Sequence, residues 1–512
     1  MVQNLNIDPI NNELPSIFAD RLGIIYAKQV NLKHKKDYGQ FFTPTSIVQL
    51  MASYSNFSGT SVKILDPGCG TAILSCGLIE HLINTSNIKV IHLVTYEIDS
   101  EIIPFSKIVL EYLKYWLLKK NIKFKYTLNN KDFILSHAEA LKKNYTGDKF
   151  NIIISNPPYF KLSKNDSRTR VAVDLVSGQP NIYSLFMGIA ANLLSEKGEL
   201  IFITPRSFAS GNYFRAFRNL FFNTVQIDKI HLFDSRKDTF TRDNVLQETV
   251  IIKATKIIIS PNKPVLLSSS RGINDIFTPK LRYYNFSELI DMESKEKILH
   301  IPINEKEENI MQLVKRWKNT LSDYNIQIST GPVVSFRSKE YLKENYEKSL
   351  APLFWLHNVN KMVLEWPLEL KNKEQFIEAG LNTKSILIPN KNYILLRRFS
   401  TKDDNSRLIA APYFSNYITS NVIGVENKVN YIYRKNGYLE RSETIGLCAL
   451  LNSHLFDTYF QIFNGNVNVS ATELREMKLP PLEIIKNIGN KIILSNDYSM
   501  QNVNYIVNKL LN

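Results

Sequence analysis

The chain has 512 residues, a hydrophobic content of 44% and a formal net charge of +15, which exclude a disordered chain and indicate a polyanionic partner. Its three cysteines are too few for a disulfide framework or a cysteine metal site, so we expect a reducing, cytoplasmic location. No apolar run reaches the ~18–20 residues of a membrane span, and the polar N-terminus predicts no signal peptide.

The length predicts two or three domains, and the first expected element is an amphipathic helix over residues 16–36. A second helix is predicted over residues 45–53. Between these helices, Gly39 and Pro44 predict a turn in a segment that also contains Thr43. Such residues are common in ordinary turns, but we interpret this one as a loop that closes over a ligand held by the next unit.

That next unit is a strand that ends at Asp66, a glycine-rich turn, and a helix over residues 72–84. Gly68 and Gly70 allow the backbone to approach a ligand closely, and the N-terminus of the helix presents N–H donors. A glycine-rich turn alone is weak evidence for a nucleotide site. The residues after the next strands are therefore needed to support a nucleotide site.

Acidic residues follow the next two predicted strands. The first of these strands ends in Glu97 and Ile98, and an acid at that position can accept both hydroxyls of a ribose. The second leads to Asp132, which can accept an adenine amine, and to Phe133, which can pack on the adenine face. Because ligands bind at the carboxyl ends of strands in open α/β sheets, we expect these groups to line one pocket. The two strands are predicted over residues 91–96 and 123–128, with a helix over residues 101–119 between them.

A proline-rich segment follows the strand predicted over residues 150–154. Asn156 and Pro157 each precede a proline, and neither proline has an N–H, so the segment leaves the sheet as a stiff shelf. The Asn156 side-chain oxygen and the Pro157 carbonyl can each accept one hydrogen of a nucleobase amine and free its lone pair. Tyr159 can stack on the base. A turn capped by asparagine is the alternative explanation for any Asn-Pro-Pro sequence.

A polar loop in the rest of the first half contains one aromatic residue, Phe240. We interpret Phe240 as the second stacking face for the base, although a local hydrophobic anchor is the more ordinary role. Pro261 and Pro264 predict a linker, which divides the chain into domains of residues 1–265 and 266–512. The elements before this linker are helices over residues 181–194 and 213–222 and strands over residues 198–204, 225–233 and 245–257.

The regular alternation of strands and helices ends in the second half. Basic residues alternate with aromatic ones here, at Arg397, Arg398, Arg407 and Arg434. A solvated charged face is one explanation, but in a basic protein with a base-binding shelf we expect a DNA-reading surface. Helices are predicted over residues 307–321 and 442–463 and from residue 472, with strands near residues 325–336, 385–398, 408–413 and 430–434.

With these motifs, nearly the whole chain resembles the γ-class DNA N6-adenine methyltransferases of type II restriction-modification systems. The resemblance implies a Rossmann-like α/β domain, a mixed sheet with helices on both faces, that binds S-adenosyl-L-methionine (AdoMet), followed by a separate α+β target recognition domain. The implied cofactor residues are Thr43, Pro44, Asp66, Gly68, Gly70, Glu97, Ile98, Asp132 and Phe133. The implied catalytic residues are Asn156, Pro157, Pro158 and Tyr159, and the implied substrate-binding residues are Phe240, Arg397, Arg398, Arg407 and Arg434.

The resemblance also implies a mechanism and partners. An adenine flips out of double-stranded DNA, and its N6 attacks the AdoMet methyl group directly, without a metal or a covalent enzyme intermediate. We expect a monomer whose cognate restriction endonuclease is a separate chain. Three alternatives stay open: a protein-glutamine methyltransferase, which would leave the basic second half unexplained, an RNA adenine methyltransferase, and a DNA-specificity subunit without catalysis, which the intact motifs disfavour.

Overall fold

The computed structural model describes residues 8–40, 42–233, 248–371, 373–400, 406–464 and 468–511. The chain divides into two compact units, residues 1–303 and residues 304–512. The first unit is longer than the sequence predicts, because strands β8 (Pro264–Ser270) and β9 (Lys280–Asn285) extend its sheet past residue 265. Pro264, expected in a linker, is the first residue of β8, a position at which strands tolerate proline.

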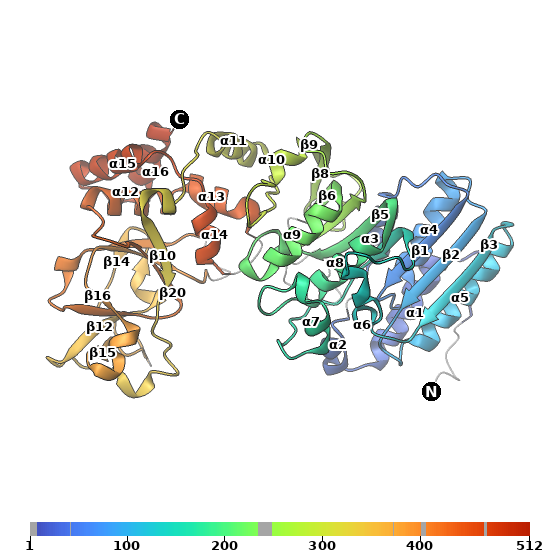
Figure 1. Cartoon of the computed structure of the whole chain (residues 1–512), viewed down its shortest axis with the longest axis horizontal. Helices are drawn as coiled ribbons and strands as arrows, with labels where there is room; N and C mark the ends of the chain where they lie inside the picture. The colour runs from blue at the N-terminus through green and yellow to red at the C-terminus, as the bar shows by residue number, and fades with distance from the viewer. Residues whose placement is uncertain are drawn as a thin grey trace. The chain divides into compact units, whose positions relative to one another are not determined.

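A nine-stranded mixed sheet forms the centre of the first unit, in the order β3-β2-β1-β4-β5-β7-β6-β8-β9 (Figure 1). Strand β1 pairs in parallel with β2 and β4, and β4 with β5, whereas β7 runs antiparallel between β5 and β6. The carboxyl ends of the parallel strands therefore meet at one edge. The remaining strands are β1 (Ser61–Pro67), β2 (Val90–Tyr96), β3 (Lys123–Asn129), β4 (Phe150–Ser155), β5 (Leu194–Pro205), β6 (Gln226–Phe233) and β7 (Thr249–Thr255).

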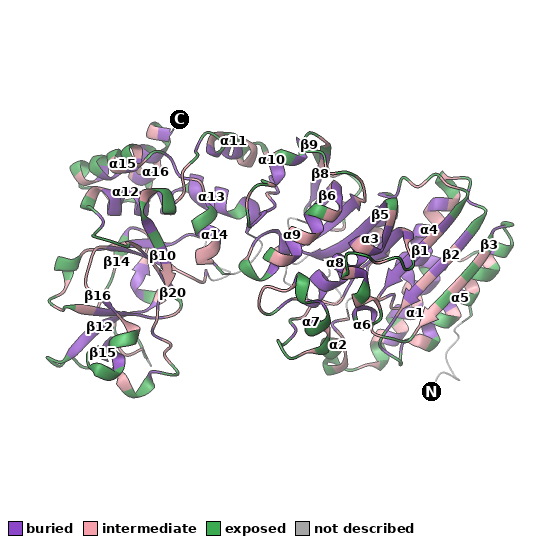
Figure 2. Ribbon diagram, in the orientation of Figure 1, coloured by how far each residue is buried: buried purple, intermediate pink, exposed green. Residues whose placement is uncertain are grey.

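Helices cover both faces of this sheet and bury its central strands (Figure 2). Because side chains alternate along a strand, Ile152 and Ile154 of β4 pack with α1, α3, α4 and α5, whereas Ile153 packs with α6, α8 and α9. The predicted α/β fold with helices on both faces is confirmed. The helices are α1 (Pro15–Gln29), α3 (Thr45–Ala52), α4 (Ile73–Thr85), α5 (Ile103–Leu118), α6 (Phe133–His137), α7 (Ser167–Val171), α8 (Ile182–Leu193), α9 (Arg215–Thr224) and α10 (Phe286–Leu289).

The helix predicted over residues 16–36 is divided into α1 and α2 (Leu32–Tyr38). Asn31 is extended, and its side chain caps α2 by accepting a hydrogen bond from the His34 N–H. Helix α2 ends at Gly39, whose φ of 61° is left-handed. The break brings the end of α2 against the segment after β4, since a Cβ atom at Gly39 would lie 2.8 Å from the Phe160 ring.

The second unit contains a four-stranded sheet, a five-stranded sheet, the two-stranded sheet β13-β14 and C-terminal helices, in agreement with the predicted α+β class. The four-stranded sheet is antiparallel, in the order β10-β20-β17-β18, and its strands lie within the predicted segments except that β20 begins one residue earlier. The five-stranded sheet, β11-β15-β12-β19-β16, lies largely outside the prediction because its strands are short. The strands are β10 (Ile326–Thr330), β11 (Leu342–Lys343), β12 (Leu350–Phe354), β13 (Val359–Asn360), β14 (Val363–Leu364), β15 (Phe376–Glu378), β16 (Leu387–Pro389), β17 (Tyr393–Arg397), β18 (Ala410–Tyr413), β19 (Val422–Val425) and β20 (Val429–Arg434).

The helix predicted over residues 442–463 is also two helices, α12 (Arg441–Asn452) and α13 (His454–Phe463), because the Ser453 side chain caps α13. Helices α12 and α15 (Leu482–Ser495) approach so closely that a Cβ atom at Gly446 would lie 1.9 Å from the Ile485 carbonyl oxygen. Within the described ranges, no helix is long and apolar enough to cross a membrane. The other helices are α11 (Glu305–Val314), α14 (Ala471–Glu476) and α16 (Met500–Leu511).

Candidate active site

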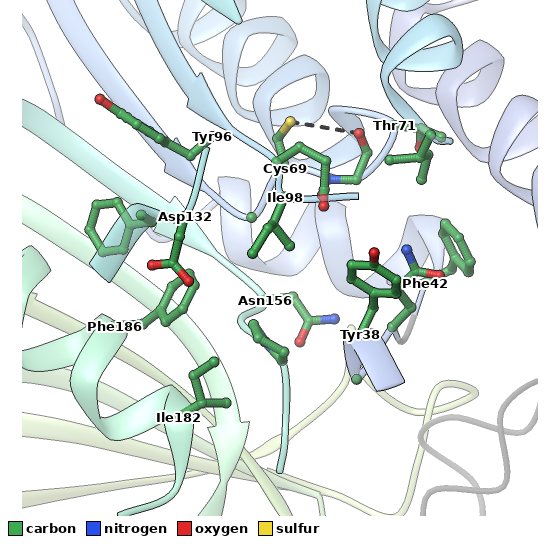
Figure 3. Close-up of a pocket in the computed structure, with 18 of the residues that line it drawn as sticks. Tyr38, Phe42, Cys69, Thr71, Tyr96, Ile98, Asp132, Asn156, Ile182 and Phe186 are labelled. Atoms are coloured by element: carbon green, nitrogen blue, oxygen red, sulfur yellow. Dashed lines mark hydrogen bonds between the residues drawn. The ribbon is translucent and has the colours of Figure 1, made fainter. Parts of the chain in front are cut away.

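A pocket of about 220 Å³ lies at the carboxyl ends of β1, β2 and β4 in the first unit. Figure 3 shows Asp132 and Phe186 at one end of this pocket, Tyr38 and Phe42 at the other, and Asn156 between them. Most of the predicted cofactor and catalytic residues therefore meet around one cavity, although they come from segments far apart in the sequence. Those that line it are Thr43, Gly68, Gly70, Glu97, Ile98, Asp132, Phe133, Asn156 and Pro158.

The glycine-rich turn after β1 folds onto the end of β2. The N–H groups of Gly68 and Cys69 donate to the Tyr96 carbonyl oxygen at 2.8 and 2.9 Å. Gly68 and Gly70 have φ angles of 87° and 54°, a left-handed region that L-residues with side chains rarely adopt. The turn thus requires glycine and exposes its backbone to the pocket.

Glu97 is held in place by backbone donors on both sides. Its Oε2 accepts the Gly70 N–H and its Oε1 accepts the Asp99 N–H, each at 2.9 Å. Burial raises the pKa of Glu97, since the side chain is only 9% exposed, but these N–H groups favour the carboxylate. The predicted ribose-binding acid is therefore oriented before any ligand binds.

Two predicted cofactor residues support the pocket without lining it. Asp66 is fully buried, and its Oδ2 accepts a hydrogen bond from the Ser75 hydroxyl of α4 at 2.6 Å. Burial raises the pKa of Asp66 to about 7. Pro44 precedes α3, and its carbonyl oxygen accepts the N–H groups of Ile47 and Val48. Both residues fix the ends of helices beside the pocket.

The Asp132 end of the pocket combines one carboxylate oxygen with an aromatic wall. Asp132 caps α6 through Oδ1, which accepts the Leu135 N–H at 2.9 Å, while Oδ2 lies 3.8 Å from Arg168 Nη1. The buried Phe133 ring lies 5.0 Å from the Phe186 ring, centroid to centroid. This end therefore offers a hydrogen-bond acceptor beside a flat apolar surface.

The catalytic shelf is fixed to the neighbouring strand and to the N-terminal loop. The Ser155 hydroxyl donates to the Pro67 carbonyl oxygen at 2.7 Å, which ties the end of β4 to β1. The Asn156 Nδ2 donates to Thr43 Oγ1 at 2.9 Å. The shelf thus leaves the sheet as predicted, and its asparagine faces the pocket.

Tyr159 is placed differently from the other shelf residues. Its hydroxyl donates to Asn156 Oδ1 at 2.5 Å and lies 3.0 Å from the Ile203 carbonyl oxygen. Burial raises the pKa of Tyr159 well above its usual value. The residue does not line the pocket in this structure, so its stacking on a base stays a prediction.

One buried carboxylate fixes the N-terminal segments beside the pocket. Asp99, which is 1% exposed, accepts hydrogen bonds from the Tyr26 hydroxyl, from the His34 ring at 2.8 Å and from Gln40 Nε2 at 2.6 Å. Burial alone would raise the pKa of Asp99, but these hydrogen bonds outweigh it and lower the pKa. Asp99 therefore holds α1 through Tyr26, α2 through His34, and the segment after α2 through Gln40.

Comparison with known proteins decides the family. A family model described as Eco57I restriction-modification methylase matches residues 83–240. The type II methyltransferase M.PstI of Providencia stuartii is 32% identical over 475 residues, which cover 92% of each chain. The type II methyltransferase M.BsuBI of Bacillus subtilis is 34% identical over 473 residues, 90% of this chain and 91% of that protein. The chain belongs to the type II methyltransferases.

The solved structure compared next has a lower sequence identity to this type II methyltransferase than the two sequence relatives have. A structure of a DrdV–DNA complex covers 93% of this chain and 59% of that chain, with a TM-score of 0.48 and 12% sequence identity. The family assignment therefore rests on the two sequence relatives.

The arginines predicted to read DNA make contacts within the second unit of this type II methyltransferase. Arg434 Nη2 lies 2.8 Å from Oε1 of Glu443, whose side chain is 3% exposed. Arg397 Nε donates to the Val359 carbonyl oxygen at 2.6 Å. Their contact with DNA stays a prediction. Arg398 and Arg407 likewise donate hydrogen bonds, to the Asn427 carbonyl oxygen and to Asn464 Oδ1.

Sequence reasoning gave no site role to many other residues that line the pocket, among them Tyr38, Arg168 and Phe186. Phe186 lies on the apolar α8, where its spacing does not distinguish it from core residues. Arg168 follows Asp166 in a polar segment, and only the nearby shelf could have drawn attention to it. Phe240 lies in residues 234–247, outside the part of the chain that the structure describes.

Proposed function

We propose that this type II methyltransferase transfers a methyl group from AdoMet to N6 of an adenine flipped out of double-stranded DNA. The observation that carries the proposal is that Asn156 lines the same pocket as Gly68 and Glu97. Methyl transfer requires the donor and the acceptor to meet at bonding distance, and this pocket combines both sets of residues. The type II methyltransferases M.PstI and M.BsuBI support DNA as the substrate.

The pocket residues fit AdoMet along its length. The Glu97 carboxylate suits the ribose hydroxyls, and the left-handed Gly68 leaves the backbone open to the methionine part. Asp132 Oδ2 suits the adenine amine, while Phe133 and Phe186 suit the adenine face. When bound, AdoMet supplies an electrophilic methyl group on a sulfonium sulfur.

The residues of the shelf activate the accepting amine. The lone pair of an adenine amine is conjugated with the ring, which makes N6 a poor nucleophile. Asn156 Oδ1 and the Pro157 carbonyl oxygen can accept its two hydrogens and draw the nitrogen toward a tetrahedral shape. With AdoMet bound, N6 would form an N–C bond as the methyl–sulfur bond breaks, and the electron pair of that bond would stay on the sulfur, which leaves as a neutral thioether. The nitrogen would then release one proton to solvent. Fixed acceptors would accelerate this step because they need no reorganisation.

We assign the choice of DNA site to the second unit, residues 304–512. Flipping a base out of a duplex costs a few kcal/mol, which contacts to the flanking DNA must offset. The net charge of +15 suits such contacts with phosphates. Methylation at a defined sequence would protect DNA from a cognate restriction endonuclease encoded as a separate chain, and we expect the enzyme to act as a monomer.

Incubation of the purified chain with unmethylated duplex DNA and methyl-labelled AdoMet tests this proposal. After digestion to nucleosides, we expect the label in N6-methyldeoxyadenosine, at one recurring sequence. Label in deoxycytidine would contradict adenine specificity. Preferred transfer to RNA or to protein glutamine would favour those alternative enzymes, and AdoMet binding without transfer would favour a specificity subunit without catalysis.

A further inference from the structure

The loop between α2 and α3, described at residues 39–40 and 42–44, contacts the catalytic amide as well as the pocket. Thr43, predicted to bind the cofactor, is 3% exposed and lies directly before Pro44, the N-cap of α3. Its Oγ1 accepts a hydrogen bond from Asn156 Nδ2 at 2.9 Å. We propose that Thr43 is a positioning residue for the Asn156 amide, an inference that rests on the proposed methyl transfer.

An asparagine amide has two different ends, and only one of them helps this reaction. Oδ1 accepts hydrogen bonds, whereas Nδ2 donates them and would repel the hydrogens of an approaching amine. In the structure, Nδ2 of Asn156 faces Thr43, and the Tyr159 hydroxyl donates to Oδ1. Oδ1 has a second lone pair that suits the substrate amine. Thr43 and Tyr159 therefore hold the amide in the orientation that the chemistry requires.

The other end of the same loop is anchored separately. Gln40 Nε2 donates to Asp99 at 2.6 Å, and the Asp99 N–H donates to Glu97 Oε1 at 2.9 Å. Gln40 thus links the loop to the acid predicted to bind the ribose, whereas Thr43 links it to Asn156. The two anchors should have separable effects: Gln40 on the affinity for AdoMet, and Thr43 on the rate of transfer.

The first test compares Thr43→Val with Thr43→Ser in the full-length chain. Valine has nearly the shape of threonine but no hydrogen-bond acceptor, so single-turnover methyl transfer should fall about tenfold, as for other lost hydrogen bonds in a buried setting. Serine retains the hydroxyl and should keep the rate within about threefold of wild type. Because Thr43 also lines the pocket, the AdoMet dissociation constant is measured for each variant and the rates are compared at saturating AdoMet. A Thr43→Val variant that transfers at the wild-type rate, or loses AdoMet affinity in proportion to rate, overturns the inference.

A double-mutant cycle with Asn156→Ala separates positioning from a general structural role. If Thr43 acts through Asn156, adding Thr43→Val to Asn156→Ala should change the remaining rate less than about twofold, because the coupling disappears with its partner. An equal loss in both backgrounds overturns the inference. If transfer by Asn156→Ala is below detection, the comparison of valine with serine decides alone.

Gln40→Leu is the matched variant at the other anchor of the loop. We expect it to weaken AdoMet binding about tenfold or more, because it removes the charge-assisted hydrogen bond to Asp99. If Gln40→Leu and Thr43→Val change the AdoMet affinity and the rate of methyl transfer in the same way, the loop only encloses the pocket, and the inference fails. Wild-type transfer to DNA is measured first: its absence overturns the proposed function and this inference together, whereas normal wild-type transfer with an unaffected Thr43→Val overturns this inference alone.

Discussion

The two units of the molecule place their predicted functional residues in different ways. In the first unit, short motifs after β1, β2, β3 and β4 converge on one pocket, because parallel strands bring their carboxyl ends to the same edge. In the second unit, the arginines lie on strands and loops whose neighbours engage them, as Glu443 engages Arg434. A site formed at the ends of parallel strands can thus be predicted from the order of motifs in the sequence. A DNA-binding surface formed by long side chains depends on tertiary contacts, which the sequence does not show.

The largest expected effect lies on the shelf of the first unit. Asn156→Ala should lower methyl transfer by about 100-fold or more, since it removes a preorganised acceptor, while binding of AdoMet and DNA is retained. Asn156→Asp should retain more activity than alanine because it keeps an acceptor. Single-turnover assays with separate binding measurements check this. Near-normal turnover by the alanine variant would remove the shelf from the mechanism.

Arg434→Ala asks whether an arginine of the second unit supports the fold or reads DNA. Its loss leaves the Glu443 carboxylate without its 2.8 Å partner, so the free energy of unfolding should fall by about 1–3 kcal/mol. Lys486→Ala is the control, because Lys486 lies 3.5 Å from the same carboxylate but is more exposed, and should cost less than about 1 kcal/mol. Denaturant unfolding measures both. Unchanged stability combined with lost DNA binding would assign Arg434 to the DNA instead.

Gly39→Ala tests the approach of α2 to the shelf. A left-handed φ of 61° costs a residue with a Cβ atom about 1–2 kcal/mol, and that atom would lie 2.8 Å from Phe160. We expect AdoMet affinity, measured by calorimetry, to fall about tenfold. Gly380→Ala is a matched control, since its Cβ would meet no atom within 4 Å. Equal affinities of the Gly39 variant and the wild type would show that the pocket does not need this contact.

We expect Asp66 to make the stability of the protein depend on pH. Its pKa is about 7 in the folded protein against a usual value of 3.8, so the folded state keeps a proton that the unfolded state loses. Stability contributed by this group is therefore present below pH 4 and is lost progressively between pH 4 and 7. Asp66→Asn should remove that part of the pH dependence, measured by denaturant unfolding at pH 5 and pH 7.5. If the free energy of unfolding changed equally with pH in the wild type and in Asp66→Asn, the raised pKa would not belong to Asp66.

Sequence patterns predicted the first unit well where local rules decide the structure. The strands before Gly68, Glu97 and Asn156 are apolar and β-branched, and they form as expected. Helix boundaries failed where one polar residue, Asn31 or Ser453, caps a new helix inside an apolar pattern. The short strands of the second unit have too few residues to show the alternation of apolar and polar side chains that predicts a strand. In the first unit, pocket residues on buried helices cannot be distinguished from core residues by their spacing.

The difference between the units is tested most directly by exchanging one of them. Residues 304–512 would be replaced by the corresponding part of a related methyltransferase that modifies a different DNA sequence, and methylated adenines would then be mapped on duplex DNA. If the first unit performs the chemistry and the second chooses the site, the hybrid should methylate the donor's sequence and leave the original one unmodified. An active hybrid that still methylates the original sequence would place recognition in the first unit and contradict this account.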